Sequence, residues 1–234
     1  MFSDVFLAMT GNEMQQLRPA KAAYMACHFS PYGKGLSNLP TQLPENSLLL
    51  LDDSTPIAGH SPNMVTEQLN ELVARFSPKA VLLDFQRQYS EDAHKMIVAI
   101  VQNSSCPVAV SEKHSAELDC PVLLPPPPAN KPLQDYLASF LQRGIYLEIA
   151  PVATKITVTA NGSKTSPIPL HSRALPFQHK RLCCHYSVQA SPGKAVFTLH
   201  RTGDDLVALS RQAYSLGVLG VVGLHQELSR LCAE

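Results

Sequence analysis

The chain has 234 residues, of which 45% are hydrophobic and 16% are charged, and this length and composition suit one α/β barrel with a sizeable core. Lys and Arg together number 19, as do Asp and Glu, so the formal net charge is zero. Nucleic acid binding needs a positive field to offset the phosphates, so a balanced chain without a basic cluster argues against a nucleic-acid partner. No apolar run is long enough to span a bilayer, so we expect no membrane partner.

The cysteines and the N-terminal residues bear on the compartment. The chain begins without a basic segment, and Asp4 interrupts the short apolar stretch that follows, so we predict no secretory signal. The 6 cysteines form no C-x-x-C pair, which argues against zinc-ribbon and thioredoxin-like sites. Reduced cysteines within apolar segments are typical of a cytoplasmic protein, and we expect that location.

The first half of the chain alternates apolar runs with helical patterns. An apolar stripe from Val65 to Phe76 predicts a helix that ends before Pro78, and Ser90 is a predicted N-cap of the next helix. The fourth and fifth apolar runs are too close together for a full crossover helix, so one helix of an ideal barrel is missing or reduced to a turn. Buried strands are expected over residues 22–29, 47–51, 80–85, 106–110 and 120–124.

The second half begins with a predicted helix over residues 133–141 that Gly144 stops, followed by a sixth strand over 145–150. Residues 155–159 then alternate in polarity, and Asn161-Gly162 predicts a type I′ hairpin turn, which indicates an antiparallel excursion. The remaining expected elements are extended runs over 182–189 and 195–200, a helix over 204–216, a last strand over 218–224 and a terminal helix over 227–232.

Continuously apolar strands that alternate with helices predict a parallel sheet covered on both faces. We therefore expect an α/β fold, a trimmed and irregular TIM-type barrel formed by residues 1–234 as a single domain, with an antiparallel hairpin after strand six. An open doubly wound sheet is the alternative. The barrel is favoured because no glycine-rich phosphate loop follows the first predicted strand.

In a parallel barrel, the functional site lies at the carboxyl ends of the strands. Nearly every apolar run of this chain ends in an ionisable or polar side chain, which predicts a polar basin at one pole. We expect Asp84 and Glu148 to form its centre, with Glu112 as a substitute for Glu148. The candidate substrate-binding residues are Asp52, Asp53, Gln86, Glu112, His114, Tyr186 and His225.

Residues 80–86 resemble the strand-four signature D-G-x-D-x-D-W-E of the family 18 glycoside hydrolases, the chitinase-like barrels. Asp84 stands at the last Asp of that signature, Phe85 at the Trp and Gln86 at the Glu. Residues 217–222 also resemble the closing strand of that family, with His225 near the place where it usually has a Trp. The resemblance implies a TIM barrel and a glycan or other small molecule as ligand.

The same resemblance implies that the family's reaction is lost here. The Glu of the signature is the general acid that protonates the leaving oxygen, and Gln86 has no such proton. Loss of a general acid typically removes about 10²–10⁴ in rate. Leu82 stands where the middle Asp orients an acetamido group. The resemblance therefore implies a barrel that binds a carbohydrate or small ligand without this acid.

Two other functions stay open. The barrel can be an active hydrolase that uses Asp84 with Glu148 or Glu112, or a scaffold whose hairpin over residues 155–169 makes an oligomer contact. Neither H-x-H after the first predicted strand nor H-E-x-x-H anywhere is present, so we predict no metal and no cofactor. The sequence also lacks a G-x-S-x-G nucleophile motif.

Overall fold

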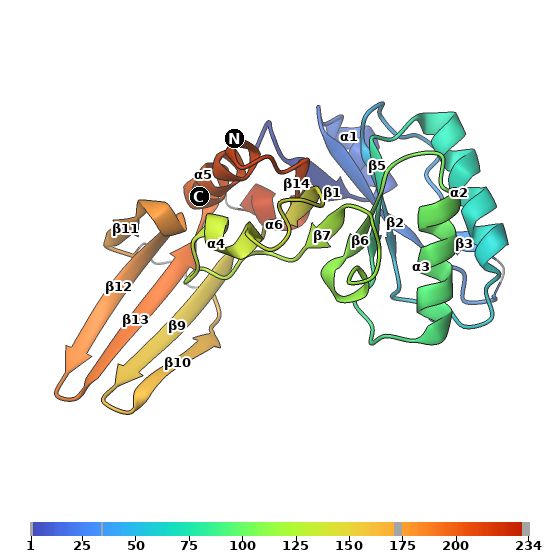
Figure 1. Cartoon of the computed structure of the whole chain (residues 1–234). Helices are drawn as coiled ribbons and strands as arrows, with labels where there is room; N and C mark the ends of the chain where they lie inside the picture. Colours follow the sequence, from blue (N-terminus) through green and yellow to red (C-terminus); the bar gives the residue numbers. More distant parts are fainter. Residues whose placement is uncertain (1, 34, 171–174, 231–234) are drawn as a thin grey trace.

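A computed structural model of the chain describes residues 2–33, 35–170 and 175–230 (Figure 1). It contains a closed barrel of parallel strands and a five-stranded antiparallel sheet that projects from it (Figure 1). Cys232 and the end of the predicted terminal helix lie outside the described residues. The predicted TIM-type barrel with an antiparallel excursion is therefore confirmed.

The barrel closes because its first strand pairs with both of its neighbours, the second strand and the last one. A short strand, β3 (Leu36–Ser37), is added antiparallel to the second strand. In order around the barrel, the strands are β1 (Phe6–Met9), β2 (Ala22–Phe29), β4 (Leu48–Asp52), β5 (Ala80–Asp84), β6 (Val108–Ser111), β7 (Val122–Leu124), β8 (Ile145–Glu148) and β14 (Gly220–Leu224).

The local sequence pattern does not predict strand β1, and the first strand that it predicts is the run at residues 22–29. Four residues are too few for a clear periodicity, and β1 becomes a strand only by pairing with β14 from the far end of the chain. Counting β1, the antiparallel excursion follows the seventh barrel strand rather than the sixth. Strand β5 becomes the fourth, which is the place that the family 18 signature occupies.

The helices cover the outside of the barrel unevenly. Ser90 caps the helix that begins at residue 91, as predicted, and Ser61 caps the helix that begins at residue 62. Each serine side chain accepts a backbone N–H three residues on. Between β6 and β7 only a 3-10 turn, η1 (Glu112–His114), is present, as the short spacing predicted. The helices are α1 (Gly11–Leu17), α2 (Pro62–Phe76), α3 (Glu91–Asn103), α4 (Leu133–Leu137), α5 (Gly203–Ser215) and α6 (His225–Arg230).

Two helices depart from expectation. Helix α1 was not predicted, and α4 ends at Leu137, before the predicted residue 141. Gly144 takes a positive φ of 73° before β8 begins.

No helix of the described segments is both long and apolar enough to cross a membrane.

The barrel interior is a layered apolar core. Alternate strand residues point inward, so Ala80 and Leu82 of β5 pack with Leu50, Leu123 and Tyr146 from other strands. Tyr146 is the largest of these side chains and is 2% exposed. It fits because β14 presents Gly220 opposite it, where a Cβ would lie 2.9 Å from Tyr146 Cδ1.

We predict that Gly220→Ala destabilises the fold by about 1–3 kcal/mol, because the extra methyl group overpacks a barrel core that cannot relax freely. Urea unfolding followed by circular dichroism measures this loss. Gly11→Ala is the matched control, since a Cβ at Gly11 meets Tyr24 Cε2 at 3.5 Å, an ordinary contact. Equal stability of the two variants would contradict the proposed packing.

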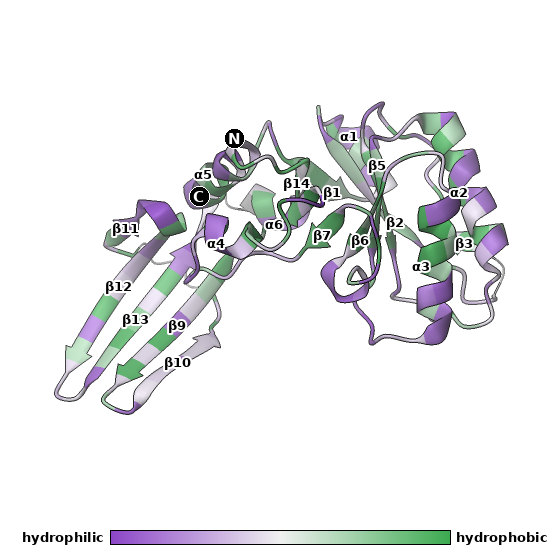
Figure 2. Ribbon diagram, viewed as in Figure 1, coloured by the Kyte–Doolittle hydropathy of each residue, from purple (hydrophilic) through white to green (hydrophobic). Residues whose placement is uncertain are grey.

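The antiparallel sheet is inserted between β8 and α5. Its strands alternate in hydropathy along β9, β12 and β13 (Figure 2), which is the pattern of a sheet with one apolar face. Ile156, Phe197 and Tyr186 lie on that face. In order across the sheet the strands are β10 (Gly162–Pro167), β9 (Val152–Thr159), β13 (Lys194–Arg201), β12 (Cys184–Ser191) and β11 (Phe177–His179).

The predicted hairpin forms, but its turn is not type I′. Thr159 pairs with Gly162, and of the two predicted turn residues only Gly162 takes a positive φ, 128°, whereas a type I′ turn needs positive φ at both Asn161 and Gly162. The excursion is also larger than one hairpin. The extended run over 195–200 pairs with β9, and the run over 182–189 pairs with β11.

Arg201 joins this sheet to the barrel. It is 1% exposed, at the end of β13, and its guanidinium donates to the carbonyls of Pro127 and Pro128 in the proline-rich connection after β7. It also donates to the carbonyls of Leu182 and Cys183, directly before β12. One buried side chain on β13 therefore satisfies carbonyl groups from two other segments of the chain.

Candidate functional site

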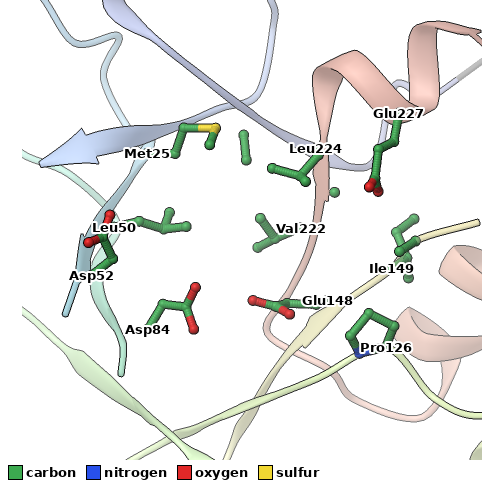
Figure 3. Close-up of a pocket in the computed structure, with 13 residues that line it drawn as sticks. Met25, Leu50, Asp52, Asp84, Pro126, Glu148, Ile149, Val222, Leu224 and Glu227 are labelled. Carbon is green, nitrogen blue, oxygen red and sulfur yellow. The ribbon is translucent and has the colours of Figure 1, made fainter. Parts of the chain in front are cut away.

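A cavity of about 280 Å³ opens at the carboxyl ends of the barrel strands, the pole at which parallel barrels place their sites (Figure 3). Its walls are mostly apolar and include Met25 of β2 and Leu50 of β4. The polar side chains in it are all carboxylic acids. The lining residues are Ala8, Met25, Leu50, Asp52, Asp84, Pro126, Glu148, Ile149, Ala150, Val222, Gly223, Leu224 and Glu227.

Asp84 and Glu148 face one another across this cavity (Figure 3). Asp84 is the last residue of β5 and is in register with Asp52 of β4, so the two aspartates lie side by side at the rim. Glu148 ends β8 and is in register with Val222 of β14, on the other side of the mouth. Each of these three acids lies two positions after a residue that points into the barrel. Since side chains alternate along a strand, all three acids also point into the barrel.

The two facing acids differ from ordinary carboxylates. Burial, and then the negative charge of Asp84, raise the pKa of Glu148 to about 7 from its usual value of 4.5. Burial also raises the pKa of Asp84, although the hydrogen bond from the Gln86 side chain opposes the rise. Near pH 7, Glu148 is therefore present in both its protonated and its ionised form.

Asp53 and Gln86 support the rim in different ways. Asp53 follows Asp52 and so points to the opposite side of its strand, where it is 4% exposed. Its carboxylate accepts the backbone N–H groups of Gln86 at 2.8 Å and Arg87 at 3.0 Å. It thereby holds the segment after β5 in place, whereas the Gln86 side chain donates to Asp84.

Glu112 and His114 lie on η1, outside the cavity lining. Glu112 is exposed to solvent. His114 is buried, and its Nε2 lies 3.2 Å from the carbonyl oxygen of Arg87, while its ring meets that of Phe85 edge to face. The structure therefore does not bring either residue together with Asp84 and Glu148.

Tyr186 and His225 are also apart from that pair. Tyr186 lies on β12 and lines a second cavity, of about 350 Å³, on the apolar face of the antiparallel sheet. His225 begins α6, and its Nδ1 is 3.6 Å from Glu13 Oε1. Neither residue is part of the lining of the barrel-mouth cavity.

Sequence reasoning missed Glu227, which the first turn of α6 brings into the cavity (Figure 3). A signal for it exists, because an acidic residue shortly after the last barrel strand lies at the same pole as the other strand ends. The apolar wall formed by Met25, Leu224 and Pro126 had no such signal. Within the described ranges, no group of three or more His, Cys, Asp or Glu residues is arranged to hold a metal ion.

Comparison with solved structures identifies this architecture. The class V chitinase from Nicotiana tobaccum has a TM-score of 0.57 at 10% identity, with 95% of this chain and 93% of that chain covered. The chitinase from Chromobacterium violaceum has a TM-score of 0.54 at 9% identity, with 98% and 99% covered. The fold is that of the chitinase-like barrels.

The spore cortex-lytic enzyme SleL from Bacillus cereus is also similar, with a TM-score of 0.53 at 10% identity, and 98% of this chain and 72% of that chain are covered. The family 18 resemblance seen in residues 80–86 thus agrees with the fold of the whole chain. No protein-family model matches the sequence. No curated protein matches it either.

Proposed function

We propose that this protein is a glycoside-hydrolase-like barrel that binds one small hydroxylated ligand, the size of a single sugar unit, in the barrel-mouth cavity. The observation that carries the proposal is the facing pair of Asp84 and Glu148 inside an otherwise apolar pocket. Few converging polar groups in a mainly apolar cavity are the usual form of a small-ligand site. A volume of about 280 Å³ favours one sugar ring over an extended chain.

The pair offers both kinds of hydrogen bond that a hydroxyl group needs. Protonated Glu148 donates, and a carboxyl oxygen of Asp84 accepts, so a sugar hydroxyl between them is satisfied on both sides. Burial strengthens such bonds, because water competes less in a cavity of low polarity. The chain contains no Trp, so we expect the aliphatic wall rather than a stacked indole to contact the ring.

Gln86 occupies the place of the family's acid in the signature resemblance, and its side chain donates to Asp84. An amide at that place supplies no proton to a leaving group, which supports binding without the family's own reaction. We expect glucose and glucosamine to raise the melting temperature of the protein. Asp84→Ala removes the acceptor and should abolish that increase, whereas the exposed Glu117→Ala should leave it unchanged.

One observation favours a second function, hydrolysis through the pair itself. A carboxyl group with a pKa near 7 is suited to general acid catalysis, and Glu148 faces a second carboxylate. Release of nitrophenol from nitrophenyl glycosides measures this activity. Under the hydrolase alternative, Glu148→Gln loses at least about 10²-fold in turnover while the protein still binds sugar. If the wild-type protein bound sugar without any turnover, hydrolysis would be contradicted and binding would remain as the proposed function.

A further inference from the structure

The barrel-mouth cavity contains acids and lacks bases. Of the thirteen described residues that line it, Asp52, Asp84, Glu148 and Glu227 are acidic, and none is Lys, Arg or His. The acids come from four separate elements, β4, β5, β8 and α6, so they converge on the space from different sides. A ligand in this cavity therefore contacts both acidic and apolar side chains.

These acids are not neutralised by the protein. No hydrogen bond or ion pair from a described residue reaches the Glu148 carboxyl group, and its neighbours Val222, Ile149 and Pro126 are apolar. From the described part of the chain, the Asp84 carboxyl group receives one hydrogen bond, from the side-chain N–H of Gln86. Lys113 acts on Asp84 from outside the lining, and its Nζ is engaged with the carbonyl oxygen of Gln86 at 2.7 Å.

We propose that the ligand of this cavity carries a protonated primary amine, which lies between Asp84 and Glu148, and that the protein prefers an amino sugar to a neutral or N-acetylated one. This inference rests on the function proposed above and specifies its ligand class. A primary ammonium group has three N–H donors and a positive charge, so it can donate to both carboxylates and neutralise their repulsion. A hydroxyl or an acetamido group supplies no such charge.

The apolar part of the cavity limits what the amine can be attached to. The part of the ligand that bears the ammonium group would contact an apolar wall, which is formed by Met25, Leu50, Val222 and Leu224. A hydrated metal ion would leave this wall unused, and the described residues offer no metal-holding cluster. A small organic molecule that bears one ammonium group, on either a sugar ring or an alkyl chain, matches both the acidic and the apolar residues of the cavity.

The proposal predicts a particular pH dependence. The groups that face or act on Glu148 are Asp84 from β5, Asp52 from β4, Glu227 from α6 and the partly buried Tyr136 of α4, while β14 presents only apolar side chains to it. Glu148 loses its proton as the pH rises through about 7, and an ammonium ligand binds the ionised form better. Butylamine, whose ammonium group stays protonated over this range, should therefore bind about tenfold more tightly at pH 8 than at pH 6, whereas the affinity of a neutral sugar should not rise.

Calorimetric titration of the full chain with four probes tests the proposal: glucosamine, N-acetylglucosamine, glucose and butylamine. We expect glucosamine to bind at least about tenfold more tightly than either neutral sugar, a difference that the charge-assisted hydrogen bonds supply. Glu148→Gln should remove this preference, and Glu117→Gln, an exposed acid outside the cavity, should preserve it.

The four probes separate this inference from the function on which it rests. Equal or tighter binding of N-acetylglucosamine or glucose would overturn the amine preference and leave the sugar-binding function standing. Binding of butylamine without any sugar would support the ammonium site and overturn the sugar-binding function. Binding of none of the four would overturn both.

Discussion

Arg201→Met should unfold at a markedly lower urea concentration than the wild type, with a loss of about 3–4 kcal/mol in the free energy of unfolding. The guanidinium is buried and donates to four carbonyl groups, those of Pro127, Pro128, Leu182 and Cys183. Each buried acceptor left without a donor costs about 1–3 kcal/mol. The desolvation cost of the buried charge, which the substitution removes, offsets part of that loss.

Arg181→Met is the matched control for this experiment. The Arg181 side chain is 68% exposed and makes a 3.7 Å ion pair with Asp135, which is 52% exposed, so its loss should change stability by less than about 0.5 kcal/mol. Arg201→Lys should fall between the two, because an ammonium group keeps the charge but not the planar fork that reaches several carbonyls. If Arg201→Met and Arg181→Met unfolded alike, Arg201 would not join the sheet to the barrel.

Glu148→Gln should stabilise the protein at pH 8 by about 3 kcal/mol and leave it unchanged at pH 4. Folding raises the pKa of Glu148 from 4.5 to about 7, chiefly through burial, so the folded state disfavours its ionised form. At about 1.4 kcal/mol per pKa unit, this rise corresponds to about 3 kcal/mol. Glutamine is neutral at every pH and carries no such penalty.

The sign of the effect sets the pH range to be measured. Below about pH 4.5, Glu148 is protonated in both the folded and the unfolded state, and wild type and variant should be equally stable. As the pH rises towards 7, the unfolded state ionises first, so the wild type loses stability, and above that the loss is complete. Urea unfolding at pH 4, 6 and 8 measures the difference, with the exposed Glu117→Gln as control. A Glu148→Gln variant with the same pH dependence as the wild type would contradict the burial of this charge.

Such a result would also explain why a destabilising acid is kept at the mouth of the barrel. An ionisable side chain in an apolar cavity costs folding free energy, and sites that bind or react with ligands are where such costs concentrate. A glutamine at this position would give a more stable barrel, but its side chain could not change its charge with pH.

Local patterns predicted the individual barrel elements well. The run over residues 22–29 is the strand β2 with the same bounds, and residues 47–51 and 80–85 are β4 and β5 to within one residue at each end. These strands are buried on both faces, so they consist of continuous apolar residues that short-range reasoning recognises. The same reasoning did not find β1, whose four residues become a strand only through partners distant in the chain.

The sequence by itself determined that polar and acidic side chains follow the buried strands, because a parallel strand must become polar where it leaves the core. It thus indicated Asp52, Asp84 and Glu148 as candidates for one pole. Only the tertiary structure decided which of the candidates share a cavity. Barrel closure through β1 turns Glu148 towards Asp84, strand alternation turns Asp53 away, and the inserted sheet carries Tyr186 to another cavity. The altered pKa of Glu148 likewise depends on burial by residues from β14 and from the connection after β7, contacts that no local pattern contains.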